Sequence, residues 1–230
     1  MEIFKIKKLE NENNKDFIYR SLRESIIKAT IKPGESISET KLKEYFNVSR
    51  SPIREALSIL IHEGLIRVEP KKNTQVVLID SEYILESRFL RCVVEKEILL
   101  KLCTTMDTNI LTKELFLIID EAEKIFINKK DSIKLISNYD ALFHGRIFEY
   151  AGFKHIWKMI RTSNIQYNRF LNLYIEEKLY GGNFISDHKQ LAQNIQNKKL
   201  DTLIEYTEEN YQRIENYLKE LIILHPDYFL

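Results

Sequence analysis

Residues 48–57 read VSRSPIREAL, and this stretch decides how the surrounding sequence is interpreted. Ser49 is a suitable cap for a helix, and Pro52 then falls in the first helical turn, where a missing N–H costs nothing. Arg50 and Arg54 lie four residues apart, so both face the same side of that helix. Two neighbouring cations repel each other mildly, and an anionic partner would compensate for this repulsion.

The sequence on either side of this helix predicts a winged helix-turn-helix. Upstream, apolar spacing predicts helices over 15–29, with Phe17, Leu22, Ile26 and Ile27 inward, and over 38–46, separated by a Pro-Gly turn. Downstream of Gly64, the segments LIRVEP and TQVVLI predict a two-stranded hairpin with Asn73 in its turn. Three helices followed by a hairpin indicate a DNA-binding domain over 1–80, in which the opening stretch begins the recognition helix.

The remaining residues, 81–230, predict an all-helical bundle. Apolar residues recur at three- and four-residue spacing throughout, and the whole chain contains only 6 glycines and 4 prolines. The fold class is therefore mainly α. The six predicted helical segments are 81–103, 107–129, 131–151, 154–178, 182–197 and 199–223.

Composition excludes several classes of protein. No apolar run reaches the length of about 18 residues that a membrane helix needs, and the opening MEIFKIKKLE lacks a signal-peptide core. Cys92 and Cys103 lie in one predicted helix at a separation of about 16 Å, which is too far for a disulfide. We therefore expect a cytoplasmic protein without a membrane partner. The net charge of +1 identifies no partner by itself.

The recognition helix and the hairpin tip carry groups that suit duplex DNA. Arginine offers paired donors that match guanine O6 and N7, while serine hydroxyls and helix N-terminal amides suit phosphate oxygens. Lysines at the hairpin tip can reach the minor groove or the backbone, although they are equally explained as solvated surface residues. The residues predicted to contact DNA on this basis are Ser49, Arg50, Ser51, Arg54, Lys71 and Lys72.

Residues 18–79 resemble the GntR family of bacterial transcription regulators. The motifs PGESISE, VSRSPIREAL and HEGLIRVEP occur in the family's order and at close spacing. The resemblance implies binding of double-stranded DNA, and it adds two positions to the predicted contacts. The family usually has glycine at the wing tip, where this chain has Asn73, and some members place a DNA-contacting arginine where this chain has Thr40. The operator sequence is therefore not predictable.

The stretch SNYDALFHGRIFEYAG, residues 137–152, contains half of a candidate metal site. Asp140 and His144 are four residues apart on one predicted helix, so a carboxylate oxygen and an imidazole nitrogen can reach the same point. Many helices carry such a pair simply as a surface ion pair. His188 lies on a later helix, and sequence alone does not show whether it joins the first two.

The helical half resembles the FadR subfamily, whose ligand-binding part is the FCD domain, and six helices resemble its shorter VanR-like branch. Many members bind a metal through an aspartate, a histidine four residues later and two further histidines. This resemblance implies ligands at Asp140, His144 and His188, with Asn210 at the fourth position. An amide is a poorer ligand than imidazole for zinc or nickel. Either three ligands hold the metal, with Asn210 or water added, or the pocket works without metal.

A further resemblance to the subfamily is the pair formed by Arg91 and Glu95. It implies an effector site in which Arg91 grips a carboxylate with two donors. An ordinary ion pair within the helix explains the same spacing equally well.

The function expected from these patterns is a homodimeric transcription regulator that acts as a repressor on a palindromic operator. A small organic acid, bound in the helical domain with or without a divalent metal, would control it. Two alternatives remain open from the sequence. One is a metal-dependent hydrolase with a DNA-binding appendage, although the chain has no H-E-x-x-H or nucleophile motif. The other is a regulator whose helical domain only dimerises.

Overall fold

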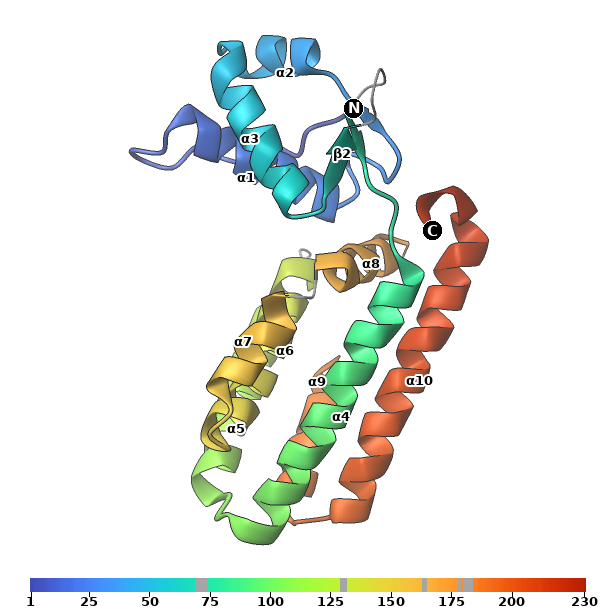
Figure 1. Ribbon diagram of the computed structural model, residues 1–230. Coiled ribbons are helices and arrows are strands. Elements are labelled where there is room, and N and C mark those ends of the chain that lie inside the picture. Colours follow the sequence, from blue (N-terminus) through green and yellow to red (C-terminus); the bar gives the residue numbers. More distant parts are fainter. Residues whose placement is uncertain (69–73, 129–131, 163–164, 178, 180–183) are drawn as a thin grey trace. The chain divides into compact units, whose positions relative to one another are not determined.

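The computed structural model describes the chain except for residues 69–73, 129–131, 163–164, 178 and 180–183 (Figure 1). The predicted wing-tip residues Lys71, Lys72 and Asn73 therefore lie outside the described residues. The chain divides into two compact units. The first comprises Met1–Ser81, Arg169–Leu173 and Leu221–Leu230, and the second comprises Glu82–Asn168 and Tyr174–Glu220.

The first unit is built around a winged helix-turn-helix. Helix α3 packs against both α1 and α2, and the strands form one antiparallel sheet in the order β1-β3-β2. Strand β1 was not predicted, because two residues are too short to show a periodic pattern. The elements are α1 (Asn14–Ile27), β1 (Ser36–Ile37), α2 (Glu39–Phe46), α3 (Arg50–His62), β2 (Ile66–Val68) and β3 (Thr74–Val76).

Local capping chemistry explains where helices α2 and α3 begin and end. The Ser38 hydroxyl accepts a hydrogen bond from the Lys41 N–H, as an N-cap should. Asn47 ends α2 in the left-handed conformation at a φ of 50°, which asparagine tolerates better than most residues. Ser49 occupies the N-cap of α3 but makes no side-chain cap bond, so its hydroxyl is not used by the helix. Gly64 follows α3 with a φ of +69°.

The core of the first unit comes from one face of each helix. Ile18, Leu22 and Ile26 of α1 recur every four residues and are buried against the apolar stripe of α3. Phe17 and Ile27, which were predicted to face inward, are only half-buried. The face of α1 is thus rotated slightly from the expected one, because Ile18 fills the interior position in place of Phe17.

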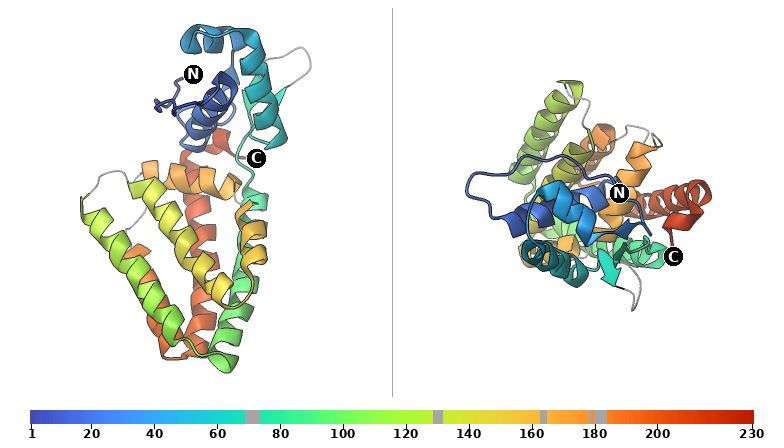
Figure 2. Two further views of the ribbon diagram at one scale, coloured as in Figure 1. Left: turned by 90° about the vertical axis from the view of Figure 1, so that its left-hand side faces the viewer. Right: turned by 90° about the horizontal axis from the view of Figure 1, so that it is seen from above.

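The second unit is the predicted helical bundle, shown from three directions in Figures 1 and 2. Helix α5 packs against α6 and α9, and α6 packs against α7. The segment 154–178, predicted as one helix, instead forms the two helices α7 and α8. The helices of this part of the chain are α4 (Ser81–Thr105), α5 (Asn109–Asn128), α6 (Ser132–Tyr150), α7 (Lys154–Thr162), α8 (Ile165–Glu176), α9 (Phe184–Gln196) and α10 (Leu200–Leu224), followed by the short 3-10 helix η1 (Pro226–Tyr228). Residues 169–173 of α8, residues 221–224 of α10 and the whole of η1 belong to the first unit.

A continuous apolar cluster fills the bundle and includes Phe143, Phe148 and Trp157. Trp157 lies against Gly145, where an added Cβ would stand 2.6 Å from the indole Nε1. Glycine at this position lets α7 approach α6 closely. Both cysteines are buried and free, as their spacing predicts. Across the described part of the chain, no helix has the length and apolar character that crossing a bilayer requires.

Candidate DNA-binding and effector sites

The first turns of α3 present polar groups on an exposed face. Arg50, Ser51 and Arg54 are exposed, while Ile53 of the same helix is fully buried. The Arg54 Nε donates to Glu39 of α2 over 3.1 Å, and the Ser51 hydroxyl donates to the neighbouring Glu55 over 3.0 Å. The mild repulsion between the two arginines is thus partly offset by an acid on the preceding helix.

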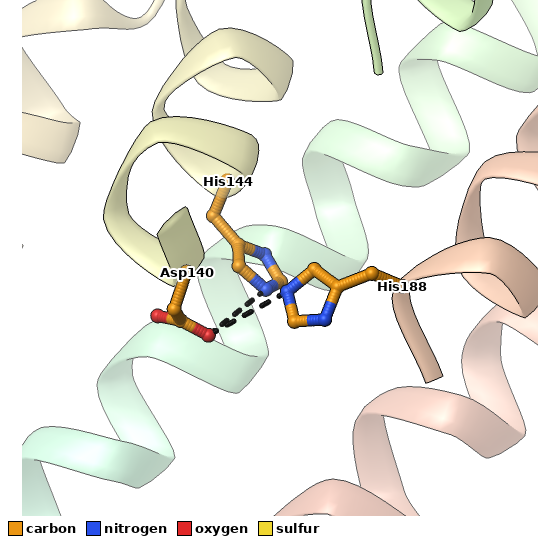
Figure 3. Close-up of side chains that lie close together, drawn as sticks. All are labelled: Asp140, His144 and His188. Carbon is orange, nitrogen blue, oxygen red and sulfur yellow. Dashed lines mark ion pairs between the residues drawn. The ribbon is translucent and has the colours of Figure 1, made fainter. Parts of the chain in front are cut away.

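Asp140, His144 and His188 converge in the second unit (Figure 3). The first two residues project from α6 and the third from α9, so the juxtaposition requires the tertiary fold. Asp140 Oδ1 lies 3.5 Å from His144 Nε2 and 3.7 Å from His188 Nε2. All three ligand atoms lie within 4.8 Å of one another, and both histidines are buried. The group can therefore hold a metal ion.

The distances from Asp140 to the two histidines agree with the coordination of a transition metal. Ligand atoms at about 2.1 Å from a tetrahedral metal stand roughly 3.4 Å from one another. The separations of 3.5 and 3.7 Å between Asp140 and the histidines need only a slight contraction to match this value. One carboxylate and two imidazoles are also the mixed oxygen and nitrogen set that zinc and nickel accept.

Glu95 of α4 determines how His144 is oriented. The Nδ1 of His144 meets the Glu95 carboxylate, so that nitrogen carries the proton and the lone pair of Nε2 is left for a metal ion. Burial lowers the pKa of His144 despite the opposing effect of Glu95, which keeps the imidazole neutral. Burial alone would raise the pKa of Glu95, but the hydrogen bond from His144 and the positive charge of Arg91 outweigh it and lower that pKa to about 2.

Arg91 links the two carboxylates of the site. Its Nη1 donates to Asp140 Oδ2 over 3.1 Å, and its Nε lies 3.7 Å from Glu95. Burial would raise the pKa of Asp140, but the positive charge of Arg91 outweighs burial and holds the pKa well below its usual value. The Arg91 guanidinium also lies over the Trp157 ring at 5.2 Å. Within the described chain, its buried Nε and Nη2 have no hydrogen-bond acceptor.

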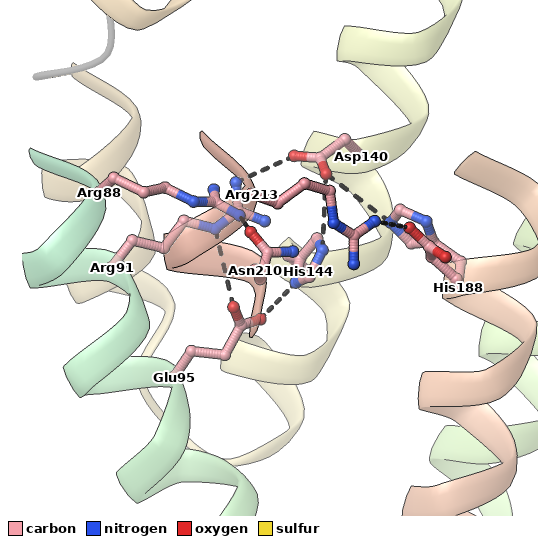
Figure 4. Close-up of polar contacts among 9 residues, drawn as sticks. Arg88, Arg91, Glu95, Asp140, His144, His188, Asn210 and Arg213 are labelled. Atoms are coloured by element: carbon pink, nitrogen blue, oxygen red, sulfur yellow. Dashed lines mark hydrogen bonds and ion pairs between the residues drawn. The ribbon is translucent and has the colours of Figure 1, made fainter. Parts of the chain in front are cut away.

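Sequence reasoning missed Arg88, which the structure adds to this group (Figure 4). Arg88 is 6% exposed, and its Nη2 donates to the Asn210 carbonyl oxygen. Asn210, the expected fourth metal ligand, thus has its oxygen engaged by an arginine. The sequence did contain a pattern that could have predicted Arg88. Arg88, Arg91 and Glu95 stand at i, i+3 and i+7, which places them on one face of α4.

The formal charges of this cluster cancel. Arg88 and Arg91 are positive, Glu95 and Asp140 are negative, and His144 is neutral. Bringing a divalent cation to this group would leave an excess of positive charge inside the bundle. An anion would then complete the balance, since an uncompensated buried charge is costly.

Comparison with known proteins now identifies the family. Residues 14–76 match the bacterial regulatory proteins of the gntR family, and residues 86–213, more than half of the chain, match the FCD domain. The chain belongs to the FCD-containing GntR regulators. The resemblance inferred from its motifs is confirmed at this level, including the FadR-like character of the helical half.

Individual relatives agree with this placement of the GntR regulator. The gluconate operon transcriptional repressor of Bacillus subtilis is 29% identical over 207 residues, which cover 87% of this chain and 83% of the relative. The HTH-type transcriptional repressor RspR of Escherichia coli is 38% identical over 78 residues, or 34% of each chain. A GntR crystal structure from Rhodococcus sp. RHA1 has a TM-score of 0.66 at 19% identity, covering 90% and 97% of the two chains, which supports the fold.

Family membership makes this protein a DNA-binding transcription regulator and not an enzyme. The alternative of a metal-dependent hydrolase with a DNA-binding appendage is therefore wrong. The histidine and carboxylate group belongs instead to the FCD domain of a regulator.

Proposed function

We propose that this GntR regulator is a homodimeric repressor whose operator binding is controlled by a small carboxylate. The carboxylate binds, together with a divalent metal, inside the helical domain. One observation carries the proposal: three ligand atoms converge beside two buried arginines that have unused donors. In this scheme residues 1–80 bind DNA, and residues 81–230 bind the effector and dimerise.

Asp140, His144 and His188 would hold the metal, for which zinc and nickel are the candidates. A bound metal would supply positive charge and coordination positions that the protein leaves open. Asn210 gives its oxygen to Arg88, so three protein ligands would remain. An incomplete protein shell is what a metal site needs if a further ligand is to reach it.

A carboxylate is the effector class that best matches the charges. With a divalent metal in place, the cluster of Arg88, Arg91, Glu95, Asp140 and the imidazoles has excess positive charge. Among the described residues, the Nε and Nη2 of Arg91 and the Nε of Arg88 have no hydrogen-bond acceptor, so they offer charged donors to an anion. Glu95, once predicted as an effector contact, would act by orienting His144 and Arg91.

DNA contacts would come from the exposed start of α3 and its surroundings. Ser49, Arg50, Ser51 and Arg54 would approach the major groove, with Thr40 of α2 alongside and Lys71, Lys72 and Asn73 at the wing tip. Two copies on a palindrome would add their contacts, and the effector would change how both copies fit the operator. The gluconate operon repressor among the relatives supports repression as the direction of control. Such a regulator would act in the cytoplasm.

Metal content of the purified protein tests the first part of the proposal. Trp157 is the only tryptophan in the sequence, and its ring centroid lies 6.3 Å from that of His144. Ni²⁺ added in a titration should therefore quench the Trp157 fluorescence. Binding should saturate at about one metal ion per chain. His188→Ala should abolish tight binding, whereas His155→Ala, a change at an exposed histidine of α7, should not. Equal binding by both variants would remove the proposed site.

Thermal unfolding in the presence of acids tests the second part. A carboxylate at about a hundred times its dissociation constant should stabilise the protein by about 2.7 kcal/mol. We expect this shift with one or more members of a panel of citrate, gluconate, succinate and acetate, and not with succinamide. The shift should vanish after chelation of the metal. A panel without any shift would favour the alternative in which the helical domain only dimerises.

A further inference from the structure

An ion pair crosses from α2 to the face of α3 that carries the exposed arginines. Glu39 is the first residue of α2 and Arg54 is the fifth residue of α3. The Glu39 Oε2 accepts the Nε–H of Arg54 over 3.1 Å, and the two side chains are 36% and 64% exposed. Exposed pairs of this kind contribute little to folding stability. Folding stability alone therefore does not explain why an acid occupies this position.

The contact engages one end of the guanidinium and leaves the other end available. Arginine has five N–H groups, of which one is on Nε and four are on the two Nη atoms. Within the described residues, Glu39 is the partner recorded for Arg54, and it takes the single Nε–H. The four Nη hydrogens have no acceptor among the described residues, and the two Nη atoms form the paired arrangement that fits two acceptors at once. Arg50, by contrast, has no acidic partner recorded in the same part of the chain.

A carboxylate beside a DNA-binding face has an electrostatic disadvantage. DNA binding is dominated by the phosphate charge, so a nearby acid weakens it and removal of the acid should strengthen it. A positioning role for the acid predicts the opposite effect on DNA affinity. An arginine that is already held loses less side-chain freedom when it meets its target. The sign of the effect of removing Glu39 therefore separates the two roles.

We propose that Glu39 is a positioning residue for DNA recognition, which holds the Arg54 guanidinium so that both Nη atoms face paired acceptors on the duplex. Those acceptors are guanine O6 and N7 or two phosphate oxygens. The inference rests on the proposed role of Arg54 as a DNA contact. It extends that role by making the affinity depend on an acid that itself repels DNA.

The experiment uses the full-length protein and a duplex selected from a random library by the wild-type chain. Fluorescence anisotropy compares this duplex with a scrambled one of equal length. Glutamine keeps an acceptor but removes the charge that holds the guanidinium, so Glu39→Gln should weaken binding to the selected duplex roughly threefold to tenfold, the range expected when one long side chain must be ordered on binding. Glu44→Gln removes the same charge from an exposed position on the same helix and should cause no loss.

The scrambled duplex distinguishes the two kinds of acceptor. A loss confined to the selected duplex assigns Arg54 to a guanine edge, and an equal loss on both duplexes assigns it to phosphates. Either result supports positioning. Glu39→Asp keeps the charge but shortens the side chain, so it should also weaken binding. It serves as the second variant if Glu39→Gln proves less well folded by circular dichroism.

A double-mutant cycle with Arg54→Ala provides the decisive comparison. In that background Glu39→Gln should no longer weaken binding, because the group that it positions is gone. The inference is overturned if Glu39→Gln alone binds as tightly as the wild type or more tightly. It is also overturned if the loss persists without Arg54. If Arg54→Ala itself binds normally, the proposed role of Arg54 fails together with the inference.

Discussion

Replacing Glu95 with glutamine should destabilise the helical domain markedly. Glu95 is 3% exposed and touches both Arg91 and His144. Glutamine has the same shape and can still accept a hydrogen bond from His144, so the substitution removes charge and little else. The Arg91 guanidinium, which is 2% exposed, would keep only Asp140 as a counter-charge.

Removing one partner of a buried ion pair typically costs about 3 to 5 kcal/mol, and the retained hydrogen bond favours the lower end. The lowered pKa of Glu95 has the same sign, because it means that the folded state stabilises the charged carboxylate. For a chain of this size, about 3 kcal/mol lowers the melting temperature by roughly 6 to 12 °C.

Urea unfolding of metal-free protein, followed by Trp157 fluorescence and circular dichroism, measures the effect. Glu114→Gln is the matched control, because Glu114 also binds an arginine, Arg146, at 2.7 Å, but both side chains are partly exposed. That variant should lose less than about 1 kcal/mol. A Glu95→Gln protein as stable as the control would refute the reasoning, because the buried charge pair would then make no net contribution to the free energy of unfolding.

Acid pH provides an independent check on the same substitution. The pKa of Glu95 is depressed on folding, so its contribution is complete above the unfolded value near 4.5 and is lost as pH falls towards about 2. The stability difference between wild type and Glu95→Gln should therefore shrink across this window. A difference that stays constant would mean that the carboxylate charge is not its source.

Three further substitutions have expected outcomes. Gly145→Ala would place a Cβ 2.6 Å from the Trp157 indole. This clash should lower the free energy of unfolding in urea by about 1 to 3 kcal/mol and shift the tryptophan emission. Unchanged emission would contradict the packing of Trp157 on Gly145. Asn210→His should tighten zinc binding about tenfold or more in a competition titration, because imidazole replaces an amide held by Arg88, and unchanged affinity would exclude this position as a ligand. Arg54→Ala should weaken operator binding at least about tenfold in a mobility-shift titration, and an unchanged midpoint would contradict the assigned recognition helix.

Local sequence determined the DNA-binding unit almost completely. Ser38, Pro52 and Gly64 act on the backbone within a few residues, so their effects can be predicted without knowledge of the fold. Strand β1 was missed because it exists only through pairing with β3. Similarly, the continuous periodicity of residues 154–178 gave no sign of the division into α7 and α8. A pattern of apolar spacing reports which face is buried, but it does not report where a helix must end.

The candidate effector site was only half determined by the sequence. Asp140 and His144 share a helix, and helical geometry alone brings them together. The approach of His188 depends on how α6 and α9 both pack against α5, and the contact between Arg88 and Asn210 joins residues 122 positions apart. Such contacts arise from the burial of apolar faces across the whole bundle. The sequence therefore determined which chemical groups the chain carries and which of them share a helix face, and tertiary packing decided which groups on different helices meet.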